Sequence, residues 1–64
     1  MKNFQTVEEI LDFAIASEEE AVDFYLELAK NAKSKEMKEA FKAFAAEEMG
    51  HKSKLLQIKE QKIF

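Results

Sequence analysis

The chain has 64 residues and a formal net charge of -3, with ten Lys, no Arg, no Cys, no Pro and a single Gly. The missing cysteines exclude disulfides, thiolate metal sites and thiol catalysis, and the negative charge argues against a nucleic-acid partner. The sequence contains no run of about 18 apolar residues, which is the length needed to span a membrane. The N-terminus also lacks the apolar core of a signal peptide. We therefore expect a cytoplasmic protein with no membrane partner.

A first helix is predicted over residues 7–32. Thr6 and Glu9 form a capping box at its start, in which the N-cap hydroxyl precedes an acidic residue by three positions. Apolar residues then recur at alternating steps of four and three, which is the period of one buried stripe on a helix. The stripe consists of Val7, Leu11, Ala14, Glu18, Ala21, Tyr25, Leu28 and Ala32.

A second helix is predicted over residues 35–62, after a turn at residues 33–34 in which Ser34 is the N-cap. A connection this short makes antiparallel neighbours of the two helices, so the predicted fold is an all-α, antiparallel two-helix hairpin. The second helix carries the same four-three stripe. Its members are Met37, Phe41, Phe44, Glu48, His51, Leu55, Ile58 and Lys62.

Both helices carry more apolar side chains than one hairpin can cover, and a large exposed apolar patch indicates an interface. Residues 1–32 carry eight acidic side chains and two Lys, whereas residues 33–64 carry five and eight, so the halves attract each other. Either the chain pairs with a copy of itself to complete a four-helix bundle, or it is the first half of a longer bundle chain. We expect a homodimer or a higher homo-oligomer. The apolar residues off the stripes include Ile10, Phe13, Ile15, Val22, Phe24, Leu26, Ala40, Ala43, Ala45 and Leu56.

Two carboxylates and an imidazole interrupt the stripes at Glu18, Glu48 and His51. A turn centred after Lys33 places Glu18 opposite position 49, and Glu48 and His51 lie one turn apart on one helix face. Burying a charged carboxylate costs several kcal/mol unless something compensates it. A divalent first-row metal accepts carboxylate oxygen and imidazole nitrogen together. The pattern therefore predicts a metal site.

A structural role for the same residues is the alternative. One buried polar residue in a helix seam can fix register or oligomeric state, and Glu18 and His51 would do so as a salt-bridged pair. Gly50, between Glu48 and His51, costs about 1 kcal/mol relative to Ala inside a helix. It indicates either a close approach by another helix or a neutral position.

Two segments around these residues resemble the ferritin-like superfamily, and its rubrerythrin-type members in particular. Residues 18–25 (Glu-Glu-Glu-Ala-Val-Asp-Phe-Tyr) look like that family's Glu-x-x-Ala helix, and residues 41–51 look like its Glu-Glu-x-x-His helix. The resemblance implies that Glu18 is a terminal ligand to one metal, that Glu48 bridges two metals and that His51 is a terminal nitrogen ligand. It also implies that the Tyr25 hydroxyl hydrogen-bonds a ligand from outside the metal site.

The resemblance further implies that the protein binds Fe(II) and oxidises it with O2 or peroxide, with Glu18, Glu48 and His51 as the catalytic ligands of a di-iron site. Zn or Mn would be substitute metals. The family's complete site has four carboxylates and two histidines, whereas this chain supplies two and one, so a second copy related by a twofold axis would complete it.

Half-length ferritins associated with encapsulins build their sites from two copies, which extends the expected location to the inside of such a shell. Rubrerythrins also carry a four-cysteine iron domain, which has no counterpart in these 64 residues. A non-catalytic alternative stays open. In that case the chain is a helical dimerisation module, stapled by a metal or set in register by its polar residues.

Overall fold

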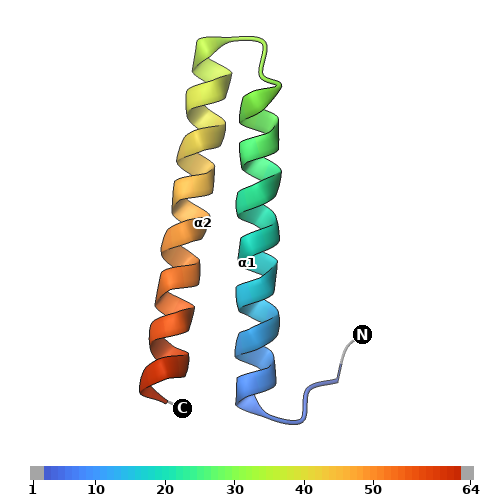
Figure 1. The fold of residues 1–64 in the computed structure, drawn as a ribbon, viewed down its shortest axis with the longest axis vertical. Coiled ribbons are helices and arrows are strands. Elements are labelled where there is room, and N and C mark those ends of the chain that lie inside the picture. Colours follow the sequence, from blue (N-terminus) through green and yellow to red (C-terminus); the bar gives the residue numbers. More distant parts are fainter. Residues whose placement is uncertain (1–2, 63–64) are drawn as a thin grey trace.

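The computed structural model describes residues 3–62 as two long helices, α1 (Val7–Lys30) and α2 (Lys35–Gln61), which lie side by side and antiparallel (Figure 1). The predicted all-α hairpin is confirmed. α1 ends two residues earlier than predicted because Asn31 terminates it: its backbone N–H and its side-chain amide both donate to the Glu27 carbonyl. Among residues 3–62, neither α1 nor α2 contains an apolar stretch that could span a lipid bilayer.

Both helices begin where the N-cap residues place them. The Glu9 backbone N–H donates to the Thr6 hydroxyl at 3.1 Å, and the Met37 backbone N–H donates to the Ser34 hydroxyl at the same distance. Each bond satisfies one of the backbone donors that the first turn of a helix leaves without a partner. The N-caps fix where each helix begins, and the short link at residues 31–34 joins the two helices. Together they determine which residues of α1 lie opposite which residues of α2 along the hairpin axis.

The line of direct contact between α1 and α2 differs from the predicted stripe. Leu11 is buried as predicted, but the other buried residues of α1 are Ile15, Val22 and Ala29, two of which were assigned off the stripe. On α2 the buried residue is Ala45, beside the predicted Phe44. The reason is rotational: each helix is turned about its own axis relative to the predicted orientation, so that Ile15 and Val22, at the edge of the predicted stripe, face the neighbouring helix.

One side of this contact line is closed by two ion pairs that cross from α1 to α2. Lys59 donates to Asp12, and Lys52 Nζ lies 2.8 Å from the Glu19 carboxylate. The hydrogen bond to Asp12 and its negative charge raise the pKa of Lys59 above its ordinary value. We call this side the ion-paired side.

The opposite side of the contact line is apolar and uncovered. The Cα atoms span 44 × 26 × 11 Å, which is the thickness of a single helix layer, so nothing else in the described chain covers it. On α2 this surface is formed by residues such as Phe44 and His51. Each precedes a residue of the contact line or the ion-paired side (Ala45 and Lys52) by one position, which is about 100° around the helix. We call this surface the open face. Its members are Ile10, Ala21, Phe24 and Leu28 on α1, and Met37, Phe44, His51 and Ile58 on α2.

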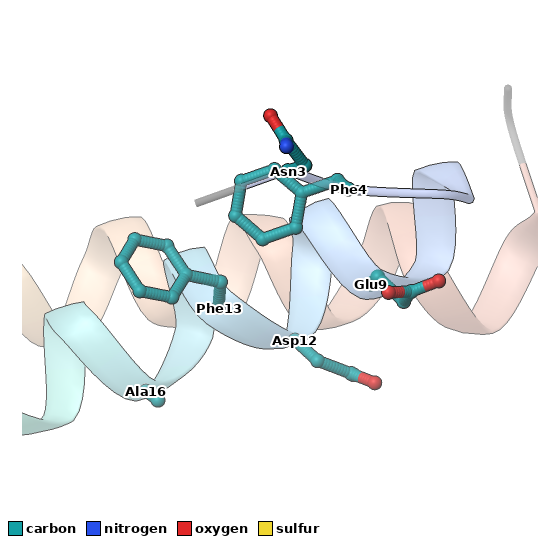
Figure 2. A pocket seen from close by; sticks show the side chains of 6 residues that line it. All are labelled: Asn3, Phe4, Glu9, Asp12, Phe13 and Ala16. Atoms are coloured by element: carbon teal, nitrogen blue, oxygen red, sulfur yellow. The ribbon is translucent and has the colours of Figure 1, made fainter. Parts of the chain in front are cut away.

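The segment before α1 folds back along that helix and brings the Phe4 ring to 5.4 Å from the Phe13 ring, between ring centroids (Figure 2). The two rings border a shallow hollow that is also lined by Glu9 and Asp12. Both of these carboxylates already have partners, because Thr6 donates to Glu9 and Lys59 pairs with Asp12. Two polar groups of the hollow are thus already engaged, and the contact between the two rings packs the segment before α1 against the start of that helix.

Gly50 provides a test of the outer surface of α2. A Cβ placed there would meet no atom within 4 Å, so the close approach that its position suggested does not occur within the hairpin. Gly50→Ala should raise the free energy of unfolding by about 1 kcal/mol, because Ala loses less backbone entropy than Gly in a helix. Urea unfolding followed by circular dichroism measures the change. A destabilised variant would mean that another chain packs closely against this position.

Candidate metal centre

Glu18, Glu48 and His51 come together at the middle of the hairpin. Glu18 projects from the middle of α1, and Glu48 and His51 project from the middle of α2, one turn apart on one helix face. Each residue offers one ligand atom, and these three atoms all lie within 4.8 Å of one another. Two segments separated by 30 residues of chain thus supply an oxygen, an oxygen and a nitrogen at one height.

His51 Nδ1 is the atom that both carboxylates approach. It lies 3.1 Å from Glu48 Oε1 and 3.4 Å from Glu18 Oε2. The Glu side chains are only 22% and 21% exposed, whereas the His51 side chain is 59% exposed. The site therefore has two carboxylates at its floor and the imidazole at its mouth, on the open face.

The chemistry of this group fits a cation. Glu18 Oε2 is buried, and within the described residues no hydrogen bond reaches it. A buried charged oxygen without a donor destabilises a fold unless a positive charge lies beside it. Two carboxylate oxygens and one imidazole nitrogen are the mixed donor set that divalent first-row metals bind. The residues present therefore fit a metal ion, with coordination positions left for further ligands.

Tyr25 lies near the site but its predicted contact is not seen. It follows Glu18 by two helical turns, and its ring packs 5.4 Å from the Phe44 ring of α2 and 5.4 Å from the Phe24 ring, between centroids. Among residues 3–62, no hydrogen bond joins its hydroxyl to Glu18, Glu48 or His51. Its hydrogen bond to a metal ligand remains a prediction for the assembled, metal-bound protein.

The Glu19–Lys52 ion pair was not predicted from the sequence. Its two residues are the chain neighbours of Glu18 and His51, which together with Glu48 we call the triad. A signal for it existed. Asp12 and Glu19 are seven residues apart on α1, and Lys52 and Lys59 are seven residues apart on α2. In an antiparallel pair of helices, two acidic residues seven positions apart on one helix can each face one of two lysines seven positions apart on the other.

The rubrerythrin family model matches residues 9–62, which covers most of the chain and includes all three residues of the triad. No curated protein and no solved structure matches the chain.

The buried oxygen of Glu18 gives a direct test. Without metal, Glu18→Gln should raise the free energy of unfolding by about 1 kcal/mol, because it removes the charge of a half-buried carboxylate whose buried oxygen accepts no hydrogen bond. The same variant should lose the stabilisation that Zn(II) gives to the wild type. Thermal unfolding with chelator and with Zn(II) measures both effects.

Glu20→Gln is the matched control for this experiment, because Glu20 is an exposed carboxylate two positions along α1 and on another side of the helix. It should change the stability by less than about 0.5 kcal/mol with or without metal. If Glu18→Gln instead destabilised the metal-free chain, the Glu18–His51 contact would be a stabilising ion pair and the register-setting role would be favoured.

Proposed function

We propose that this chain, which belongs to the rubrerythrin family, binds Fe(II) at Glu18, Glu48 and His51 and oxidises it with O2 or peroxide. The observation that carries the proposal is the convergence of the three ligand atoms around a buried carboxylate oxygen that lacks a hydrogen-bond donor. Such an arrangement is unfavourable when empty and favourable around a cation.

The donor types suit iron oxidation. Glu18 and Glu48 provide hard anionic oxygens, which stabilise Fe(III) relative to Fe(II) and so make the loss of an electron easier. His51 holds its nitrogen at the mouth of the site, where its exposure leaves room for an oxidant to approach from the open face. Fe(II) is the substrate here. Two Fe(II) ions each give one electron, and one H2O2 with two protons takes both electrons and becomes two water molecules.

A second copy of the chain completes the site in this proposal. Two carboxylates and one histidine cannot fill the coordination of two metals, and a copy related by a twofold axis would supply an identical set. The open face supports this arrangement, because it carries exposed apolar side chains, such as Phe24, Met37 and Phe44, on the same surface as the exposed His51 side chain. The resulting dimer would be a four-helix bundle with the metals at its centre.

Aerobic titration with Fe(II) tests the activity. The wild type should oxidise about two irons per pair of chains rapidly, as followed by the absorbance of Fe(III). Glu48→Ala and His51→Ala should each slow this oxidation by at least about tenfold, because each removes a ligand. Glu47→Ala is the matched control, since Glu47 is the exposed neighbour of Glu48 about 100° around the helix. Equal rates in all four proteins would contradict the proposal.

The dimer interface has its own test. Phe44→Gln should raise the dissociation constant of the dimer by about tenfold or more, because a buried Phe contributes about 1.5 to 3 kcal/mol and each dimer loses two. Sedimentation velocity with and without Zn(II) measures the assembly. Leu26→Gln is the matched control, because Leu26 is as exposed as Phe44 (43% and 44%) but follows Glu19 by two turns on the ion-paired side. The same weakening in both variants would exclude the open face as the specific interface.

A non-catalytic role is the second candidate, and one observation favours it. His51 already contacts both carboxylates without a metal, at 3.1 and 3.4 Å, so the triad can act as a register-setting polar cluster or as a metal staple between two copies. Tight Zn(II) binding with no Fe(II) oxidation would support the staple. No metal uptake of any kind would support the register-setting role.

A further inference from the structure

Two ion pairs of the same kind link α1 to α2 on the ion-paired side. Asp12 pairs with Lys59, and Glu19 pairs with Lys52 with 2.8 Å between Nζ and Oε2. The pairs are two helical turns apart on each helix. They offer a natural comparison, because their chemistry and their connection are the same and only their distance from the metal site differs.

The Glu19–Lys52 pair lies directly beside the triad. Glu19 follows Glu18 on α1, and Lys52 follows His51 on α2, so the pair is displaced from the ligands by one residue, or about 1.5 Å along each axis. Asp12 is six residues before Glu18, which is about 9 Å along the helix. A movement of the helices at the site is therefore opposed first by Glu19 and Lys52.

The triad needs such a constraint because its own contacts between the helices are weak. The only ion-pair distance that joins α1 to α2 within the triad is the 3.4 Å between Glu18 Oε2 and His51 Nδ1. A shared metal would need its ligands at about 2.0 to 2.2 Å, and a slip of one residue moves a ligand by about 1.5 Å. A register error of one residue would thus remove Glu18 from the metal. The buried residues beside it, Val22 and Ala45, are apolar and do not define the register by direct polar contacts.

Resting on the proposed metal site, we propose that the Glu19–Lys52 ion pair is a positioning pair that holds α1 and α2 in the register at which Glu18 meets Glu48 and His51. Neither side chain touches the metal in this proposal. Lys52 keeps its ammonium group on Glu19, on the ion-paired side, while its neighbour His51 faces the open face. The Asp12–Lys59 pair stabilises the hairpin without setting the geometry of the site.

Charge reversal tests this role on the full chain with Co(II) alone, whose absorption bands report both affinity and coordination geometry. Lys52→Glu and Glu19→Lys should each lower the affinity for Co(II) by about fivefold and alter the spectrum. The double variant, which restores the pair in the opposite sense, should recover both the affinity, to within about twofold, and the spectrum. Lys52→Met, which keeps the apolar stem of the side chain, should lose less than Lys52→Glu.

A purely electrostatic effect would give a different pattern. Lys52→Glu brings a negative charge toward the cation and would raise the affinity, whereas Glu19→Lys would lower it. Positioning lowers the affinity in both variants. An increase in the Lys52→Glu variant, or a double variant that stays impaired, would overturn the inference.

Reversal of the second pair is the matched control. Asp12→Lys and Lys59→Asp should lower the thermal stability of the hairpin yet leave the affinity for Co(II) within about twofold of the wild type. Equal losses of affinity at the two pairs would show a general stabilising effect and overturn the inference. A wild-type chain that failed to bind Co(II) would overturn the proposed metal site itself, which separates the two failures.

Discussion

The structure depends on the surroundings of one carboxylate oxygen, Glu18 Oε2, which is buried at the centre of the hairpin, accepts no hydrogen bond within the described residues and lies 3.4 Å from His51 Nδ1. Glu48 places a second carboxylate close by, so two like charges share the site. A chain that needed only a stable hairpin would place a Leu or an Ala at either position. The conflict between folding and charge is resolved if the protein gains a cation there, and this is the physical reason to regard the triad as a binding site.

The thinness of the hairpin is the second constraint. A single layer of two helices buries Leu11, Ile15, Val22, Ala29 and Ala45, and it leaves large side chains such as Phe24 and Phe44 half-exposed. Small domains without disulfides commonly obtain the missing stability from a partner chain or a metal. In the proposed dimer, association of two copies would provide both the partner chain and the complete metal site, because the exposed His51 side chain lies on the same surface as the exposed apolar side chains.

Local sequence rules were sufficient for much of this fold. The N-cap hydroxyls of Thr6 and Ser34 set the start of each helix, and the four-three period identified the helices and the class of the fold. Glu18, Glu48 and His51 could be grouped because the length of the turn determines which residues of an antiparallel pair share a height. These inferences succeeded because each depends on backbone geometry, which varies little between proteins.

What the sequence could not provide was the rotation of each helix about its own axis. A stripe with period 3.5 has two edges, and nothing in the spacing says whether Ala21 or Val22 faces the neighbour, since both are apolar. The packing of two helices decides this, and it buries Val22. The same rotation directs Lys52 to Glu19 and His51 to the open face, so the ion pair beside the site became visible only with the structure.

The position of the triad halfway along both helices has a consequence for its chemistry. Glu18 is about 17 Å from either end of α1, beyond the Debye length of about 8 to 10 Å at cellular ionic strength. The partial charges at the helix termini, which tune many anion and cation sites, are therefore too remote to act here. For the proposed metal site, any fine adjustment of the redox potential would therefore come from side chains within a few ångströms, which are the immediate neighbours of the ligands.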